Sequence, residues 1–133
     1  MVRAMASGLP VTRTMLYTVV QLPDQIDTSN ADEVREQLLA LLNAGAGPLI
    51  VDLTGTTFCD SSAVNALLRT HTRAGALGCR LHVAVTPGGI VRKVFDITAV
   101  SRVISLADDV GSAIAMAMHM TLEDAGSGRP EGT

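Results

Sequence analysis

A short polar turn carries the residues with the most specific chemistry in this 133-residue chain. Asp60, Ser61 and Ser62 follow Phe58 and Cys59, between an apolar run and a leucine-rich stretch. Asp and Ser are preferred helix N-caps, because their side-chain oxygens accept hydrogen bonds from the free N–H groups of the first turn. A serine hydroxyl can also accept a phosphate, which adds about −1.5 to −2 charges. This turn therefore predicts a helix cap, a phosphorylation site, or both.

Nucleophilic catalysis by these serines has little support. A catalytic serine needs a base and a third group that orients the base. His71 is expected two to three helical turns further along, His82 in a strand at the opposite edge, and His119 shows no spacing that suggests this role. The three histidines also lack the spacing of metal ligands. We expect no catalytic residue, no metal site, no cofactor and no enzymatic activity.

Cys59 and Cys79 are the only cysteines, and they lack the CxxC spacing of zinc or redox sites. The topology inferred below separates them by about 15–20 Å, whereas a disulfide needs Cα atoms within about 7 Å. Two free thiols suit a reducing, cytoplasmic location. Cys59 abuts a helix N-terminus, which lowers the pKa of a thiol, and it is therefore a possible redox site.

Composition excludes two classes of partner. Single-stranded nucleic acid is bound on aromatic rings beside a basic groove, but aromatic residues make up 2% of this chain and its net charge is −3. No stretch approaches the roughly 18 uninterrupted apolar residues of a membrane span, and the N-terminus lacks the apolar run of a signal peptide. We expect no nucleic-acid partner and no membrane partner.

The elements that must position the turn alternate between strand and helix. We expect a flexible leader over residues 1–10, a single domain over 11–120 and a disordered tail over 121–133. Apolar periodicity predicts strands over residues 11–22, 49–53, 81–85 and 103–106, the first of them one strand or a tight hairpin. It predicts helices over residues 30–44, from the turn at 58–62 to 75–78, from residue 90, and from residue 110. Asn30 and Glu33 have the spacing of a capping box at the first helix.

Alternating strands and helices imply an α/β fold with a mixed, mostly parallel sheet of four or five strands and four α-helices. The N-terminal stretch is expected to contribute the antiparallel strand. In such sheets, binding sites gather at the carboxyl ends of the strands, where loops lead into helices. The segment 58–62 occupies that position.

The ordered runs 49–55, 58–68, 81–85 and 94–97 resemble the STAS domain of bacterial anti-sigma factor antagonists. The resemblance covers about residues 20–118. It rests on an apolar strand that ends in Asp52-Leu53, the Asp-Ser-Ser turn, a leucine-rich helix and the downstream sequence Val94-Phe95-Asp96-Ile97. It implies a single STAS-like domain.

The resemblance also implies a function. In that family, the second serine of the turn is phosphorylated by a partner that is both anti-sigma factor and serine kinase, and a phosphatase reverses the modification. By position the acceptor is Ser62, with Ser61 as second choice. The unphosphorylated protein binds the anti-sigma factor and releases the sigma factor. We expect the partner surface to combine the turn, the following helix and the loop 24–29, through Asp24, Asp27, Cys59, Asp60, Ser61, Ser62, Ala63 and Asn65.

Two positions depart from the family pattern. Family members usually have Gly after the two serines and near the position of Asp24, whereas this chain has Ala63 and Asp24. Alanine is the better helix former by about 1 kcal/mol, so Ala63 is predicted to stiffen the start of the helix.

Three alternatives stay open on the sequence alone. The module is redox-regulated at Cys59, or it is unregulated. A third class is a STAS domain that binds a small ligand or nucleotide through Gly88, Gly89 and Arg92, where a helix start could hold a phosphate, or that serves a lipid-transport partner.

Overall fold

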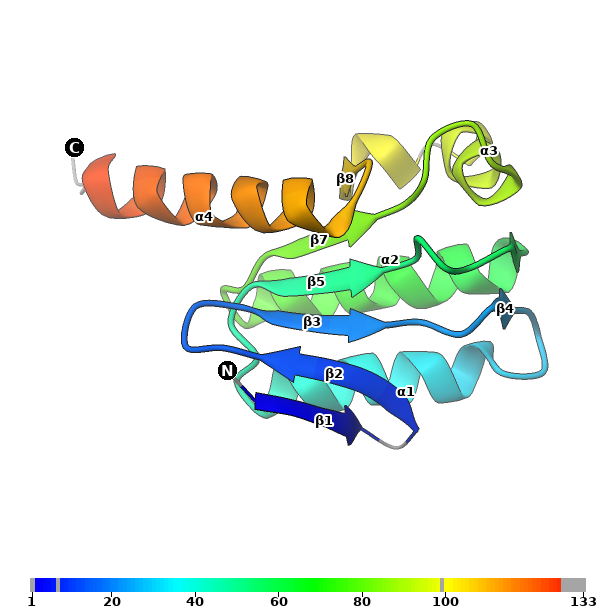
Figure 1. Cartoon of the computed structure of the whole chain (residues 1–133), viewed down its shortest axis with the longest axis horizontal. Helices are drawn as coiled ribbons and strands as arrows, with labels where there is room; N and C mark the ends of the chain where they lie inside the picture. The colour runs from blue at the N-terminus through cyan, green and yellow to red at the C-terminus, as the bar shows by residue number, and fades with distance from the viewer. Residues whose placement is uncertain (1, 7, 99, 128–133) are drawn as a thin grey trace.

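The computed structural model describes residues 2–6, 8–98 and 100–127, in which strands and helices alternate as the sequence predicts (Figure 1). The elements in chain order are β1 (Val2–Ala6), β2 (Leu9–Arg13), β3 (Thr18–Gln21), β4 (Gln25–Ile26), α1 (Ala31–Asn43), β5 (Leu49–Asp52), β6 (Phe58–Cys59), α2 (Ser61–Ala76), β7 (Leu81–Ala84), α3 (Ile90–Ile97), a 3₁₀ turn (Val100–Arg102), β8 (Ser105–Ala107) and α4 (Val110–Ser127).

The main sheet has the strand order β1-β2-β3-β5-β7-β8. β1, β2 and β3 pair antiparallel, and β3, β5, β7 and β8 pair parallel. Val51 in β5 lies opposite Val20 in β3 and Val83 in β7, and all three are fully buried. Consecutive parallel pairing aligns the carboxyl ends of these strands, and this edge of the sheet leads into the candidate site.

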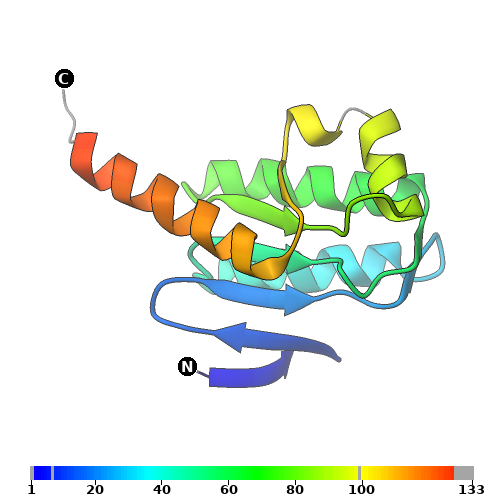
Figure 2. The same cartoon turned by 45° about the horizontal axis from the view of Figure 1, so that its top comes forward.

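Helices cover both faces of the sheet (Figures 1 and 2). α1 and α2 pack side by side on one face, where Leu38, Leu67 and Val51 belong to the larger buried cluster. α4 covers the other face around Ile50, with the small side chains of Ala113 and Ala117 against the sheet. Side chains of a strand alternate between faces, so neighbouring residues of β5 serve the two clusters in turn.

The predicted α/β fold, with a mostly parallel sheet and four α-helices, is confirmed. The main sheet contains six strands in the described part of the chain, more than the four or five predicted. The first predicted strand is a hairpin, the second of the two alternatives. In its turn, the Thr14 hydroxyl oxygen accepts hydrogen bonds from the backbone N–H groups of Leu16 and Tyr17, at 3.1 and 3.0 Å, and Met15 and Leu16 are exposed.

Both predicted chain ends differ from the structure. Residues 1–10, expected to be a leader, contain β1 and the start of β2, because backbone pairing with β2 holds Val2–Ala6 in the sheet whatever their side-chain pattern. Residues 121–127, expected to belong to a disordered tail, are helical, since α4 continues to Ser127. The rest of that prediction, residues 128–133, lies outside the described residues. Within the described ranges, no helix is long and apolar enough to cross a membrane.

Leu38 tests the core between α1 and the sheet. Its side chain is 0% exposed, so Leu38→Ala is expected to lower the free energy of unfolding by about 2–5 kcal/mol, through lost burial and an unfilled cavity. Urea denaturation followed by circular dichroism measures the change. Leu16→Ala is the matched control: Leu16 is 64% exposed, and its truncation should change stability by no more than about 0.5 kcal/mol. Equal losses in the two variants would contradict this assignment of the core.

Candidate functional site

Asp60 is the N-cap of α2, as the sequence predicts. Its backbone is extended, and its carboxylate accepts a hydrogen bond from the Ser62 N–H at 2.9 Å. The Ser62 hydroxyl donates to the same carboxylate oxygen. The backbone carbonyl of Asp60 accepts from the Ala63 N–H at 3.1 Å and so begins the helical pattern. One residue therefore both starts the helix and orients the Ser62 hydroxyl.

A two-residue parallel ladder holds the turn in place. β4 pairs with β6, with Gln25 opposite Phe58 and Ile26 opposite Cys59. At its ends, the Thr57 N–H donates to the Asp24 carbonyl at 2.7 Å and the Asp60 N–H donates to the Ile26 carbonyl at 3.3 Å. The Thr57 hydroxyl also donates to the Asp24 carboxylate at 2.8 Å. The ladder thus joins the loop 24–29 to the serine turn, and these two predicted parts of the site are brought together.

Asp27 organises the entry into α1. Its carboxylate accepts hydrogen bonds from the hydroxyl and the N–H of Ser29, and these bonds, the hydroxyl first, lower the pKa of Asp27. The Asn30 side chain bonds the backbone of the preceding loop. It accepts a hydrogen bond from the Asp27 N–H at 3.0 Å and donates one to the Gln25 carbonyl at 2.9 Å. Asn30 makes no side-chain cap bond to α1. The predicted capping box with Glu33 is therefore wrong, because the Asn30 amide is already engaged in the preceding loop.

The predicted partner-binding residues divide into surface and core. Asp24, Ser61 and Asn65 are exposed, and Asp27, Asp60 and Ser62 are half-buried, so all six can be reached by a partner. Cys59 and Ala63 are each 2% exposed and belong to the core cluster beneath the turn. β6 and the first turn of α2 direct both side chains inward, so these two predicted partner-binding residues present almost no side-chain surface. The methyl group of Ala63 consequently leaves the surface around Ser62 free.

Cys59 differs from the predicted redox site. Burial first, and the neighbouring Asp60 carboxylate second, raise the pKa of the Cys59 thiol to about 11. The position beside a helix N-terminus predicts the opposite direction, but desolvation of a thiolate and a nearby negative charge outweigh the helix dipole. Cys59 and Cys79 are both free, as predicted.

Sequence reasoning missed Arg35 and Arg69 near Ser62, and it named Phe58 only as part of the turn 58–62. Phe58 is 41% exposed at the edge of the turn. Arg35 from α1 and Arg69 from α2 line a hollow of about 200 Å³ together with Ser62 and Asn65. Arg69 follows Ser62 by seven residues, a spacing that places both on one helix face and could have been found. Arg35 lies on another helix, and no local pattern in the sequence links it to the serine.

The glycines proposed to hold a phosphate form a turn before α3. Gly88 has φ +80° and Gly89 is the N-cap of α3. The nearby Arg92 guanidinium donates to the Val85 carbonyl and to the Asp108 carboxylate, both at 3.1 Å. Arg92 therefore joins α3 to the segment before α4, and its charge is engaged within the protein.

The histidines lie away from the serine turn. His71 follows Ser62 by nine residues on α2, about 13.5 Å along the axis. His82 is buried in β7, where Nδ1 lies 3.2 Å from the Ser105 hydroxyl, and burial first and Arg80 second lower its pKa. In the described residues, no group of three or more His, Cys, Asp or Glu side chains could hold a metal ion.

Comparison with known proteins places this geometry in a family. The family model described as STAS domain matches residues 9–113. No curated protein sequence matches the chain significantly.

Solved structures share the fold at low sequence identity. An anti-sigma factor antagonist from Mycobacterium paratuberculosis is 18% identical, with a TM-score of 0.74 over 83% of this chain and 92% of the other. A putative anti-sigma factor antagonist from Thermotoga maritima is 16% identical, with a TM-score of 0.74 over 83% and 94%. The Bacillus cell fate determinant SpoIIAA in its phosphorylated form is 22% identical, with a TM-score of 0.61 over 81% and 97%. At these identities the likeness establishes the fold.

The role of Asp60 as a helix cap can be tested by measuring the free energy of unfolding of variants at this position. Asp60→Ala removes the acceptor for the Ser62 N–H and is expected to lower the free energy of unfolding by about 1 kcal/mol. Asp60→Asn keeps an oxygen acceptor and is expected to lose clearly less. Chemical denaturation measures both, with Ser61→Ala at the exposed neighbouring position as control. Equal losses in the Ala and Asn variants would show that the carboxylate does not act as the cap.

The thiol of Cys59 is expected to resist alkylation. With a pKa of about 11 and 2% exposure, it is almost entirely protonated and shielded at about pH 7.5, and thiolate is the reactive form. Iodoacetamide should label Cys79, which is half-buried, well before Cys59. Peptide mass spectrometry of the native protein measures the order, and labelling in urea supplies the accessible reference. Faster labelling of Cys59 than of Cys79 would revive the redox hypothesis.

Proposed function

This chain belongs to the STAS-domain family, and from that membership we propose that it is an anti-sigma factor antagonist. It binds an anti-sigma factor that is also a serine kinase, and this binding frees the sigma factor. Phosphorylation of Ser62 by that partner ends the binding, and a phosphatase restores it. The protein acts in the cytoplasm as a binding module, without a catalytic group of its own.

The observation that carries the proposal is the setting of the Ser62 hydroxyl. It lies at the first turn of α2, half-buried, and donates to the Asp60 carboxylate. A kinase needs a hydroxyl that is presented at the surface in a defined orientation, and the Asp60 carboxylate supplies that orientation. Ser61 is more exposed but no described hydrogen bond fixes its hydroxyl, which favours Ser62 as the acceptor.

The surroundings of Ser62 support a protein partner. The β4–β6 ladder places the loop 24–29 beside the turn, so two segments distant in sequence form one surface. Phe58 adds an exposed aromatic ring next to polar Asp24 and Asp60. Protein interfaces combine an aromatic anchor with a polar rim in this way. Phe58, Asp24 and the serines are accordingly the proposed contact residues.

A phosphate at Ser62 changes this surface while the fold tolerates it. The first N–H groups of a helix and its positive dipole end favour negative charge, so the modified helix start stays stable. The partner meets a new dianion beside the Asp60 carboxylate. The phosphate weakens the complex if it faces acidic groups of the partner, or if it prevents Ser62 from being buried in the interface. The phosphorylated form of SpoIIAA shares this fold, which is consistent with the proposal.

Two alternatives receive less support. Redox control at Cys59 requires an accessible thiol of low pKa, whereas burial raises the pKa of Cys59 to about 11. Nucleotide binding at Gly88 and Gly89 would have to rely on the exposed Lys93, which lines the same small hollow, since Arg92 is bonded to Val85 and Asp108.

Phosphorylation of Ser62 is the decisive test. The chain is incubated with a cognate anti-sigma kinase and ATP, and the phosphopeptide is mapped by mass spectrometry. We expect modification at Ser62, none in Ser62→Ala and normal modification in Ser61→Ala. Ser62→Asp should weaken binding to the same kinase by tenfold or more, about 1.4 kcal/mol, measured by calorimetry.

The controls distinguish an effect at Ser62 itself from a general effect of added charge or of a changed fold. Ser61→Asp carries the same added charge one residue away and should weaken binding less, because Ser61 is not the oriented hydroxyl. A chain that stays unmodified at Ser62 and binds as well after Ser62→Asp would rule out the phosphoswitch while leaving the STAS fold intact.

A further inference from the structure

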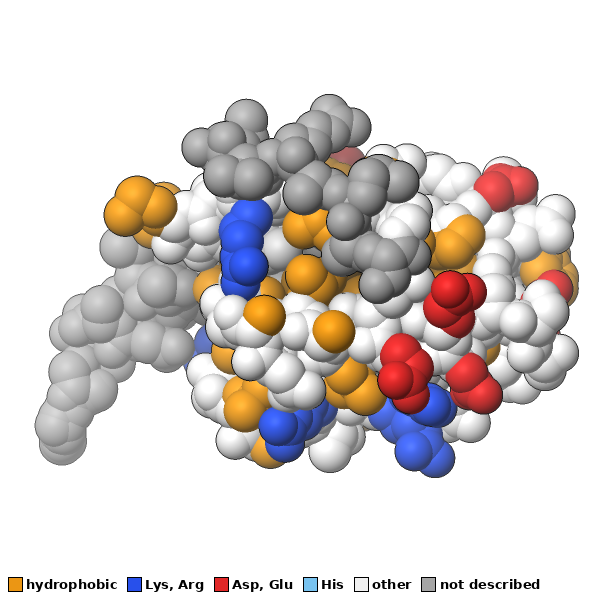
Figure 3. Space-filling model, turned by 90° about the horizontal axis from the view of Figure 1, so that it is seen from below, with side chains coloured by type: hydrophobic (Ala, Val, Ile, Leu, Met, Phe, Trp, Pro, Cys, Tyr) orange, Lys and Arg blue, Asp and Glu red, His pale blue; other side chains and the backbone are white. Residues whose placement is uncertain are grey.

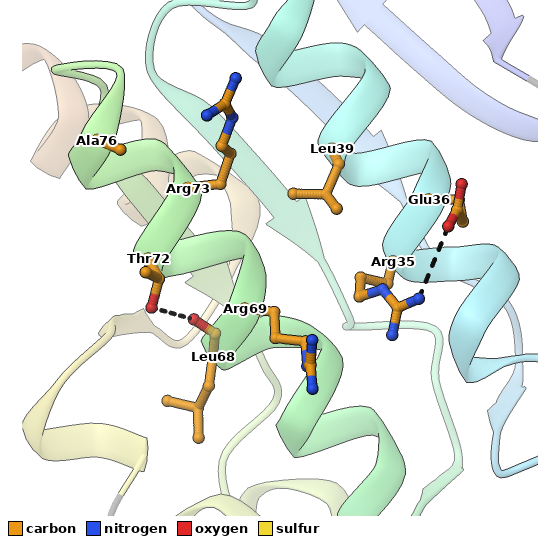
Figure 4. A pocket seen from close by; sticks show the side chains of 8 residues that line it. All are labelled: Arg35, Glu36, Leu39, Leu68, Arg69, Thr72, Arg73 and Ala76. Carbon is orange, nitrogen blue, oxygen red and sulfur yellow. Dashed lines mark hydrogen bonds and ion pairs between the residues drawn. The ribbon is translucent and has the colours of Figure 1, made fainter.

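A groove between α1 and α2 begins at the serine turn. Leu39 and Leu68 are its larger apolar lining residues, and the arginines Arg35, Arg69 and Arg73 line it as well (Figure 4). The hollow that contains Ser62 shares Arg35 and Arg69 with this groove. The two therefore form one continuous surface, with Ser62 at one end and basic side chains along its length.

The three arginines differ in the side chains that they already bind. Arg35 pairs with Asp32 at 3.2 Å and with Glu36 at 3.7 Å. Seen from below, acidic side chains gather toward the end of the molecule where α1 begins, with basic side chains beside them (Figure 3). Arg73 donates from Nε and Nη2 to the Asn43 side-chain oxygen, at 3.1 and 2.9 Å. Arg69 is exposed and, within the described residues, has no hydrogen bond or ion pair.

The position of Arg69 suits a phosphate on Ser62. Seven residues correspond to about 10.5 Å along a helix and to nearly the same face. Helical side chains lean toward the N-terminus, so the Arg69 side chain leans toward Ser62. Figure 4 shows its guanidinium turned toward Arg35 across the groove. The Ser62 side chain has the same lean and is bonded to Asp60, so the phosphoserine turns about its Cα–Cβ bond to bring the phosphate toward the guanidinium.

We propose that Arg69 is the intramolecular partner of the phosphate on Ser62, with Arg35 as a weaker second cation. This inference rests on Ser62 being a phosphoacceptor, as proposed above. Arginine presents a planar fork of donors that matches phosphate oxygens in a bidentate pair. Arg35 contributes less, because Asp32 and Glu36 already share its charge.

The pairing gives phosphorylation a second effect. In the unmodified protein, the Arg69 guanidinium is a free cation at the mouth of the groove, available to a carboxylate of the partner. In the phosphorylated protein, the same guanidinium is occupied by the phosphate. The modification thus adds negative charge at Ser62 and also occupies a cation two helical turns away. The partner therefore loses its contact with Arg69 as well as its contact with Ser62.

The phosphate would meet charges from three sources. Asp60 lies in its own turn and raises its second pKa. Asp32 and Arg35 face the same hollow from α1, and their charges oppose each other. Arg69 and the helix N-terminus favour the dianion and lower that pKa from about 6. Only the contribution of Arg69 is removed by substituting Arg69.

The test installs phosphoserine at position 62 during translation, so no kinase is required. Phosphorus NMR then gives the second pKa of the phosphate. Arg69→Gln is expected to raise it by about 0.3–0.8 pH unit, since a nearby cation favours the dianion. Arg35→Gln should raise it less. Arg73→Gln removes the same charge on the same helix face, about 16.5 Å from Ser62, and should leave it unchanged.

A second measurement needs no variant. In the full-length chain, the Arg69 Nε–Hε resonance should move downfield when Ser62 carries the phosphate, and the Arg73 resonance should stay in place. Equal pKa shifts in Arg69→Gln and Arg73→Gln, or an unmoved Arg69 resonance, would overturn the pairing. Failure of a kinase to modify Ser62 would contradict the proposed function only, because the phosphate here is supplied independently.

Discussion

The uninterrupted parallel pairing of β3, β5 and β7 is the constraint on which the rest of the structure depends. The central residues Val20, Val51 and Val83 lie opposite one another and are fully buried, so a register shift would expose them. Because neighbouring residues of β5 face opposite clusters, the same strand fixes both helical layers. The aligned carboxyl ends then determine where the connections to β4, β6 and α2 begin. The core thus determines where the serine turn begins, and the β4–β6 ladder then holds it in place.

Asp60 concentrates several functions in one side chain. It caps α2, bonds the Ser62 hydroxyl and contributes to raising the pKa of the thiol beneath it. A carboxylate in this position makes the hydroxyl directional, and it adds to the larger effect of burial in keeping the neighbouring cysteine protonated. The site therefore favours chemistry at the serine oxygen over chemistry at the adjacent sulfur. Its control over the two groups follows from distance and burial, which residue types alone do not specify.

Local patterns in the sequence were sufficient to predict β5, α2 and the helix cap at Asp60. An apolar run between Pro48 and Gly55 indicates a buried strand, and the leucine spacing after Ser62 indicates an amphipathic helix. Features that depend on distant partners could not be found this way. β1 is a strand because β2 pairs with it, and the direction of the Cys59 pKa shift depends on how deeply the turn is buried. Arg35 and Ser62 line the same hollow only because α1 packs on α2, and no local spacing in the sequence encodes that packing.

The hairpin turn at Met15 and Leu16 lies at the other end of the strands from the serine turn (Figure 1). It shares that end with Gly47, Pro48 and Gly78, which lie where the chain returns to the amino ends of β5 and β7. Met15 is fully exposed, so a fluorophore or a fused reporter domain attached there would leave both the core and the serine turn untouched. The same separation lets the chain be tethered to a surface or a larger scaffold by this end while the serine turn at the opposite end stays open to solvent.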